Sequence, residues 1–432
     1  MTEARNFEKA AMRKVSLRLI PFLFVLYVVA YLDRINVGFA QLQMKGALGF
    51  SDSVYGLGAG IFFVGYFLFE VPSNLILVRT GARVWIARIM ITWGLIASAM
   101  AIVETPAAFY ALRFLLGVAE AGFFPGVIYY LSQWFPAAER ASAISRFMTA
   151  AAVSGIIGGT LSGALLMLDG AAGLAGWQWI FVAEGIPSVV LGVAVLFFLT
   201  DRPEQATWLS PAEQAFLGAK MQAEADHIAR VGHVSLRQAL LHPTVWRLSL
   251  LSFTLLVGLY SISFWLPQIV KSFSSLDNVE VAFISAIPYV AATVAMVMVG
   301  AHSDRSRERC LHVAGAALLG AVGLAMSAFV HSPVPGLIAL SVAAMGIFSA
   351  IPVFWSLPTA FLSGTAAAGA IALINSLGNL GGFVGPYLIG RVRDVTGSFT
   401  GSLLIIAGLL VGSSALALSL RRSPANAESR NE

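Results

Sequence analysis

Six ionisable side chains lie within long apolar segments of this sequence, and all six fall in its first half: Asp33, Arg34, Glu70, Arg113, Glu120 and Glu184. A charge at the centre of a lipid bilayer costs at least about 2.5–3.5 kcal/mol, so each of these residues requires a partner or a purpose. The apolar segments of the second half carry no charge in their central portions, and no histidine lies deep in any segment. A histidine proton relay is therefore not expected.

The spacing of these charges places several of them on shared helix faces. Arg113 and Glu120 are seven residues apart, so their side chains point the same way from one helix, with a glycine between them. Tyr31 and Arg34 share one face of an earlier helix, whereas Asp33 is turned about 100° from Arg34. The sequence therefore predicts that guanidinium and carboxylate groups meet between these two helices.

Two interpretations of this cluster are open. The acids and arginines could pair only to hold the helices together, although a charge-free core is often as stable. Alternatively, desolvation and a change of partner could switch a buried carboxylate between its charged and neutral forms, so that it binds a proton on one side of a membrane and releases it on the other. Arginine stays charged, and its planar fork fits a carboxylate. An anionic substrate could therefore replace the internal acid as the partner of the arginine, and this exchange would couple the movement of the substrate to that of the proton.

Polar residues in the second half predict the opposite wall of a cavity. Asn375 and Asn379 are four residues apart and share one helix face. Pro352 and Pro358 flank Trp355, and this pattern predicts a broken helix beside a binding site. A single tryptophan or tyrosine can equally belong to an interfacial belt or to packing.

Composition defines the class of protein that contains these residues. The 432 residues are 58% hydrophobic and 11% charged, whereas a soluble chain is about a quarter charged. The single cysteine, Cys310, excludes an internal disulfide and a cysteine metal cluster, and we expect no cofactor and no metal site. We predict an all-α polytopic membrane protein, with twelve transmembrane helices in two six-helix bundles, near 17–41, 54–78, 84–103, 106–131, 142–167, 179–199, 244–270, 279–300, 311–330, 335–362, 367–390 and 398–420.

The domain organisation follows from the break between the sixth and seventh spans. We expect a first bundle over 1–199 that holds the membrane-embedded charges, a linker over 200–243, and a second bundle with a short tail over 244–432. Within the linker, Ser210 and Glu213 have the spacing of a capping box that begins a surface helix. No cleavable signal peptide is apparent, so we expect the first apolar run to be retained as a helix.

The distribution of lysine and arginine predicts the orientation. Placing the amino terminus inside assigns 21 of the 27 basic residues to cytoplasmic segments, and only Lys45, Lys271, Arg391 and Arg393 fall outside. This positive-inside bias predicts cytoplasmic termini in a bacterial inner membrane. The same bias explains the excess of basic residues. Nucleic acid is therefore not an expected partner.

Two loops resemble the cytoplasmic signature of the major facilitator superfamily. The segment 300–309 (GAHSDRSRER) matches its pattern of glycine, three residues, Asp-Arg and further basic residues. The counterpart in the first half is 74–83, where Asn74 and Val78 stand in place of the usual glycine and aspartate. The resemblance implies a duplicated-half architecture and a gating role for residues in both loops: Arg79, Gly81, Arg83, Asp304 and Arg305.

Three further segments resemble the anion:cation symporter branch of that superfamily. They are 31–40 (YLDRINVGFA), 70–74 (EVPSN) and 113–125 (RFLLGVAEAGFFP). The branch resemblance implies organic carboxylates as substrates, moved with protons, and proton-coupling roles for Asp33 and Glu120. It also implies that six residues bind the substrate or serve as partners of these acids: Tyr31, Arg34, Tyr66, Arg113, Trp355 and Asn375.

The predicted function is therefore a secondary active transporter that imports a sugar acid, dicarboxylate or aromatic acid by proton symport with alternating access. The alternative is a proton-coupled efflux antiporter of drugs or metabolites. The fifth span lacks the Gly-Pro dipeptide typical of the superfamily's drug antiporters, which favours import. An enzyme is not expected because no nucleophile–base cluster or phosphate loop is present. The expected partners are a small organic anion, protons and the lipid bilayer, with the chain acting as a monomer.

Overall fold

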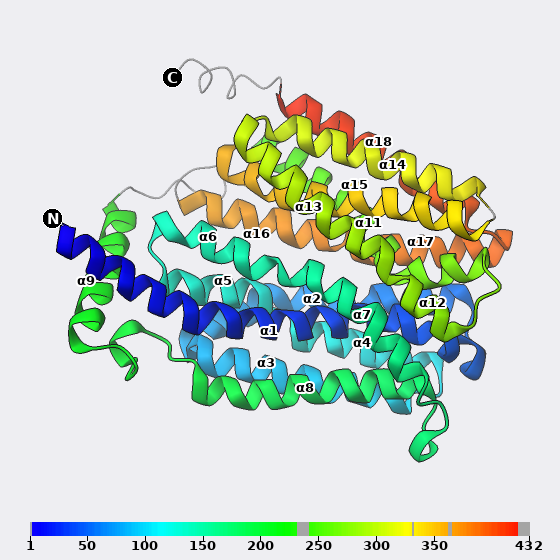
Figure 1. Cartoon of the computed structure of the whole chain (residues 1–432), viewed down its shortest axis with the longest axis horizontal. Coiled ribbons are helices and arrows are strands. Elements are labelled where there is room, and N and C mark those ends of the chain that lie inside the picture. The colour runs from blue at the N-terminus through cyan, green and yellow to red at the C-terminus, as the bar shows by residue number, and fades with distance from the viewer. Residues whose placement is uncertain (1, 231–241, 331, 362–364, 422–432) are drawn as a thin grey trace.

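The computed structural model describes residues 2–230, 242–330, 332–361 and 365–421, and within these ranges it contains helices and no strands (Figure 1). The first group of helices comprises α1 (Thr2–Leu48), α2 (Asp52–Thr80), α3 (Ala82–Ala99), α4 (Pro106–Glu120), α5 (Phe123–Trp134), α6 (Ala137–Met148), α7 (Ala150–Leu166) and α8 (Gly176–Phe198). Two 3₁₀ turns lie in its loops, at Met100–Ile102 and Ala171–Gly173.

A 3₁₀ turn at Pro203–Gln205 and the helix α9 (Pro211–Arg230) separate this group from a second one. The second group comprises α11 (Pro243–Ser272), α12 (Asn278–Ile284), α13 (Ala286–Ser306), α14 (Arg309–Phe329), α15 (Pro333–Phe361), α16 (Thr365–Asn379), α17 (Gly381–Thr396) and α18 (Thr400–Arg421). Figure 1 shows the two groups lying against each other along their length. We call α1–α8 the first half and α11–α18 the second half.

Eleven helical stretches among the described residues are long and apolar enough to cross a membrane. They correspond to eleven of the twelve predicted spans. The remaining span, predicted at 367–390, is divided at Leu380 into α16 and α17, which have 15 and 16 residues. Each is shorter than the roughly 20 residues that a single crossing requires, so the two helices cross together.

One prediction about a helix break is wrong. α15 runs from Pro333 to Phe361 without interruption, with Pro352 and Pro358 inside it. Each proline removes only one backbone donor, and neighbouring helices tolerate that loss in a buried span. Other spans are divided, and the fourth is divided between α4 and α5, where Gly122 has a φ of +89°. Ala121 leaves the helical conformation after Glu120, and Gly122 then takes the left-handed conformation that glycine adopts without strain before α5 begins.

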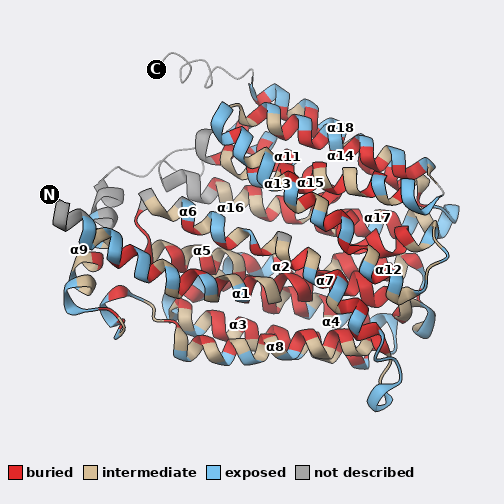
Figure 2. Cartoon of the chain, viewed as in Figure 1, coloured by how far each residue is buried: buried red, intermediate tan, exposed pale blue. Residues whose placement is uncertain are grey.

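Each half is held together by close helix pairs. In the first half α3 packs on α8, and α2 packs on α4. A Cβ on Gly117 of α4 would lie 1.9 Å from the carbonyl oxygen of Phe62, so this glycine sets how closely α2 and α4 approach. In the second half α14 packs between α15 and α18. Figure 2 shows that buried residues follow the faces where helices meet.

The halves meet along a small set of helices. α2 packs on α17, α1 on α11, and α7 on α12 and α13. α1 begins and α18 ends at the same end of the molecule, where α9 also lies (Figure 1). We call this the terminal end and the opposite one the far end.

The linker helix α9 is tied to α1 at the terminal end. The predicted capping box is present, since the backbone N–H of Ser210 donates to Glu213 Oε2 at 2.7 Å and the Glu213 N–H lies 3.3 Å from Ser210 Oγ. The Ser210 N–H also holds the pKa of the Glu213 carboxyl below its ordinary value. Lys14 of α1 forms an ion pair with the same carboxylate at 3.0 Å.

Candidate functional site

A buried ion pair lies where the two halves meet. Arg34 of α1 donates from Nη2 to Glu120 Oε1 at the end of α4, and its Nη1 donates to the Tyr260 hydroxyl of α11 at 3.3 Å. Arg34 is 8% exposed and Glu120 is 1% exposed, so water screens the pair very little. Because Tyr260 belongs to the second half, this arginine joins both halves at the centre of the molecule.

Aromatic rings surround the two buried guanidinium groups. Arg34 lies 5.6 Å from the ring centres of both Phe62 and Tyr66, and Arg113 lies 5.1 Å from that of Phe62. The ring of Phe62 therefore contacts both cations. Such contacts contribute about 2 kcal/mol or more when they are desolvated, so the rings help to keep the cations inside the protein.

Among the described residues Arg113 forms no ion pair with an acid. Its Nε and Nη2 donate to the backbone carbonyls of Gly58 and Ala59 at 3.2 Å each, while its Nη1 is buried without a hydrogen-bond partner. The residue is fully buried. Arg113 therefore positions α2 against α4 and leaves one N–H donor unused among the described residues.

Asp33 points away from Arg34, as its position one residue earlier on the helix requires. Its Oδ2 accepts hydrogen bonds from Trp93 Nε1 of α3 at 2.5 Å and from the Ser188 hydroxyl of α8 at 2.6 Å. Its Oδ1 is buried without a partner. Asp33 therefore lies inside the first half, separate from the ion pair between Arg34 and Glu120.

Glu70 of α2 joins the two halves nearer the terminal end. Its two carboxylate oxygens accept from Asn375 Nδ2 at 2.6 Å and from the Ser376 hydroxyl at 3.0 Å, both on α16. The sequence singled out Glu70 and Asn375 separately and did not connect them. The signal was present, because Glu70 is an unpaired acid in one half and Asn375 a polar residue of the other half, but only the fold shows that α2 faces α16.

The remaining substrate-binding candidates lie on three different helices, α1, α2 and α15. Tyr31 is buried, with its ring 6.3 Å from that of Tyr27 in an edge contact. Tyr66 is buried beside Arg34. Trp355 of α15 is half-buried, and its nearest ring is its neighbour Phe354. Their assignment to a substrate stays a prediction.

The predicted gating residues lie where helices end or begin at the terminal end: Arg79 in the last turn of α2, Gly81 between α2 and α3, Arg83 in the first turn of α3, and Asp304 and Arg305 in the last turn of α13. Gly81 has a φ of +91°, and the backbone N–H of Arg83 donates to Asp201 at 2.8 Å, so this loop is tied to the end of the first half. Asp304 pairs with Arg309 at 3.7 Å within its own half. Among the described residues no ion pair connects Arg79 or Arg83 with Asp304 or Arg305, and the gating roles of all five residues stay predictions.

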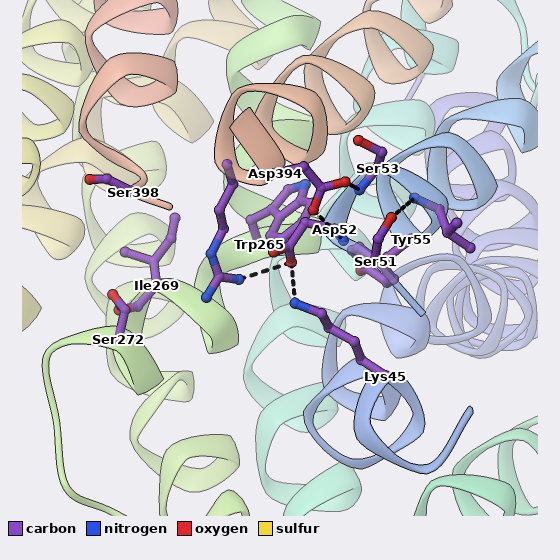
Figure 3. Close-up of polar contacts among 12 residues, drawn as sticks. Lys45, Ser51, Asp52, Ser53, Tyr55, Trp265, Ile269, Ser272, Asp394 and Ser398 are labelled. Carbon is purple, nitrogen blue, oxygen red and sulfur yellow. Dashed lines mark hydrogen bonds and ion pairs between the residues drawn. The ribbon is translucent and has the colours of Figure 1, made fainter. Parts of the chain in front are cut away.

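A polar cluster that the sequence did not reveal joins the halves at the far end (Figure 3). Asp52, at the start of α2, accepts from Lys45 at 2.6 Å and from Arg393 of α17 at 3.0 Å. Asp394 of α17 accepts from the backbone N–H groups of Asp52 and Ser53 at 2.9 and 2.8 Å. A carboxylate of the second half therefore caps the first turn of a helix in the first half.

The far end is also packed at backbone level. The Tyr55 hydroxyl donates to the carbonyl of Phe264 in α11 at 3.0 Å. A Cβ on Gly390 of α17 would lie 2.2 Å from the carbonyl oxygen of Asp52. A side chain at this position would push α2 and α17 apart, so the glycine permits the halves to touch.

Two groups of membrane-spanning helices that meet around buried charges define a membrane transport protein, and comparison with known proteins identifies its family. Residues 23–386 match the Major Facilitator Superfamily, and the chain belongs to this family. A protein of Agrobacterium vitis named "Putative tartrate transporter" is 54% identical over 97% of this chain and 93% of its own length.

A second relative, the "Quinolone resistance transporter" of Acinetobacter baumannii, is 44% identical over 93% of each chain. Among solved structures, a bacterial homologue of the human lysosomal transporter Spinster, in an inward-facing and occupied conformation, has a TM-score of 0.75. It is 17% identical, with 94% of this chain and 96% of that chain covered. The predicted all-α, multi-pass transporter fold is confirmed, and the family consists of transporters and not enzymes.

Proposed function

We propose that this protein is a secondary active transporter that imports an organic carboxylate together with protons by alternating access. The observation that carries the proposal is the buried pair of Arg34 and Glu120, which also contacts Tyr260 across the two halves. A cation held between an internal carboxylate and the opposite half can exchange that carboxylate for an external one. The relative named for tartrate supports a carboxylate substrate, since tartrate is a dicarboxylate.

The proposed cycle follows from the chemistry of this pair. When Glu120 takes up a proton its charge is lost, and Arg34 becomes free to bind a substrate carboxylate through its planar fork. The ring of Phe62 and the guanidinium of Arg113, which has one unused donor, would adjoin the bound anion. When the proton leaves, the carboxylate of Glu120 competes for Arg34 and displaces the substrate.

Asp33 is proposed as the other proton-binding group. Its carboxyl lies inside the first half, with hydrogen bonds to one oxygen and none to the other. Because no cation is paired with it among the described residues, burial favours its neutral form, and its charge can change without breaking the pair of Arg34 and Glu120. This separation supports a cycle in which the proton and the anion occupy neighbouring sites.

The placement in the membrane is also proposed. The terminal end would face the cytoplasm of a bacterial inner membrane, because the basic residues concentrate in the segments at that end. We propose the division into a bundle over 1–199, a linker over 200–243 and a bundle over 244–432, and that the chain acts as a monomer. Rocking of the two bundles would then expose the centre to each side in turn.

Export of drugs or metabolites in exchange for protons is the second candidate function. The relative named for quinolone resistance, 44% identical over most of both chains, supports it. The same buried acids would serve either direction, because both cycles load and release protons. The two functions differ in whether an inward proton gradient drives a solute into or out of the compartment that faces the terminal end.

Reconstitution into liposomes tests the proposal. We expect an inward proton gradient to drive accumulation of at least one member of a panel containing tartrate, sugar acids and aromatic acids, and a protonophore to abolish it. Arg34→Lys should lose carboxylate uptake while the protein still folds, because lysine has no fork, and Asp33→Asn should lose accumulation. Gradient-driven uptake that survives both substitutions would contradict the mechanism, and gradient-driven expulsion of a quinolone would favour export.

A further inference from the structure

A second buried carboxyl group lies close to Asp33, and the cycle described above does not use it. Glu184 of α8 is 3% exposed, and its Oε1 lies 3.4 Å from the Ser162 hydroxyl of α7. One helical turn along α8, the Ser188 hydroxyl lies 2.6 Å from Asp33 Oδ2 and 3.4 Å from the backbone carbonyl of Glu184. The Ser188 hydroxyl therefore joins the Asp33 carboxyl to the helical turn of α8 that carries Glu184.

The order of the two acids along the membrane follows from the directions of their helices. α1 runs from the terminal end toward the far end, and α8 runs back. Asp33 faces Ser188, while Asn36, one turn further along α1, lies beside Glu184. Glu184 is therefore about one turn, roughly 5 Å, closer to the far end than Asp33.

One oxygen of each acid is left without a hydrogen bond in the described part of the chain. Asp33 Oδ1 and Glu184 Oε2 are buried without a partner in the described residues, and the Asn36 side chain adjoins Glu184. A buried polar atom without a partner costs about 1–3 kcal/mol, and more when it is charged. A proton placed between the acids, with Asn36 able to donate or accept, would satisfy part of this deficit.

In the described part of the chain, no cation next to these acids is free to neutralise them. Among the charged groups next to them, Arg34 of α1 is bound to Glu120 of α4, and neither Asp33 nor Glu184 takes part in an ion pair of the described residues. The neighbouring side chains that hydrogen-bond to the acids, from α3, α7 and α8, are Trp93, Ser162 and Ser188, which do not titrate here. Two neighbouring negative charges without a cation are strongly disfavoured inside a bundle, so a proton shared by the two acids would relieve their repulsion.

We propose that Glu184 and Asp33 form one proton-binding site, in which Glu184 receives a proton from the far end and passes it to Asp33. In the transfer, the O–H bond on Glu184 breaks and an O–H bond on Asp33 forms, so the pair holds one proton and one negative charge before and after. Ser188 positions the acceptor, and Asn36 adjoins the donor. The role in transport rests on the proposed proton symport, whereas the shared site itself does not.

Infrared titration of the protein in lipid nanodiscs tests the shared site without any substrate. The C=O band of a protonated buried carboxyl should disappear as the pH rises, and the midpoint of this loss should move in both Glu184→Gln and Asp33→Asn. The matched control is Glu104→Gln, the same change at an exposed residue, which should leave the midpoint unchanged. An unchanged midpoint in folded Glu184→Gln would show that the two acids titrate independently and would overturn the site.

Transport assays then test the relay. Glu184→Gln should lose gradient-driven accumulation but keep exchange of substrate for substrate, which requires no net proton movement, and Glu184→Asp should restore part of the accumulation. Full accumulation in Glu184→Gln would overturn the relay. An infrared C=O band that responds to sodium at constant pH would also overturn it, because it would mark a metal-cation site. If wild-type protein shows the coupled titration but no proton-driven uptake, the proposed function fails and the shared site stands.

Discussion

The far end and the terminal end of the molecule hold the two halves together in different ways. At the far end Asp394 caps the first turn of α2, Arg393 pairs with Asp52, and Gly390 allows direct backbone contact. At the terminal end, the described ion pair between Asp304 and Arg309 is exposed and stays within one half. The pair of Asp52 with Arg393 is partly buried, and Asp394 bonds backbone N–H groups directly, so the described polar contacts join the two halves more firmly at the far end.

The difference indicates how the two sides of a rocking transporter can be controlled. To open the far end, a few ion pairs and hydrogen bonds must break at the same time as α2 separates from α17. Between the two ends, Glu70 joins α2 to α16 through Asn375 and Ser376, so it is the polar link to the second half on the terminal side of Arg34. Four substitutions test this comparison, beginning with the largest expected effect.

Gly390→Ala should have the largest effect. The added methyl group would lie 2.2 Å from the carbonyl oxygen of Asp52, and since that atom belongs to the backbone, α2 and α17 must move apart. We expect uptake to be lost and the far end to widen. Pulsed EPR between spin labels at Glu104→Cys and Ser398→Cys, both exposed, in a Cys310→Ser background would measure the widening.

The control for this substitution is Gly408→Ala, because no atom lies within 4 Å of a Cβ at that helical position. It should retain the wild-type distance distribution and uptake. A wild-type distance distribution in Gly390→Ala would show that contact of α2 with α17 does not determine closure of the far end.

Asp394→Asn should have the next largest effect. It replaces the charged acceptor of two backbone N–H groups, each bond contributing about 1.5–3 kcal/mol. We expect at least a tenfold increase in the population with a wide far end, which corresponds to about 1.4 kcal/mol. The same pair of spin labels measures this population.

Asp169→Asn is the matched control for Asp394→Asn. Asp169 accepts from the backbone N–H of Gly176 at 2.8 Å, but both residues belong to the first half. Its substitution should lower the melting temperature without changing the distance between the labels. Equal effects of the two substitutions on that distance would mean that the bonds of Asp394 have no special role in closure.

Glu70→Gln should have a moderate effect. Glutamine keeps the shape and can still accept from Asn375 or Ser376, but the bonds lose their charge assistance. We expect the rate of substrate exchange to change by less than about tenfold, because the conformation of this structure loses about 1 kcal/mol of stabilisation. Ser376→Ala, which removes one of the two bonds, should change the rate in the same direction by less, and opposite directions would contradict the link.

Asp304→Asn should have the smallest effect on the stability of this state. The Asp304 side chain is 74% exposed and its pair is 3.7 Å long, so we expect a change within about 0.5 kcal/mol. If the predicted gating role is right, uptake should still fall, because the residue would act when the terminal end closes. Thermal unfolding and uptake measured on the same preparation separate these effects, and a large loss of melting temperature would contradict the comparison.

Much of the fold could be predicted from residue pattern alone. Runs of about 20 apolar residues require helices because lipid offers no partners for backbone polar groups, so the spans follow from composition. Breaks within spans were harder to predict. The prolines of α15 do not break it, while Gly122 breaks the fourth span through a local conformation that no hydrophobicity pattern records.

The sequence by itself determined which residues carry charge into the membrane, because the apolar runs that must span the lipid fix which charged residues lie within them. It also placed Asp33 and Arg34 on different helix faces. Only the tertiary structure decided their partners: Arg34 with Glu120 and Tyr260, Asp33 with Trp93 and Ser188. Partner choice depends on distances between helices far apart in the chain, and these distances are set by packing that the order of residues in one helix does not reveal.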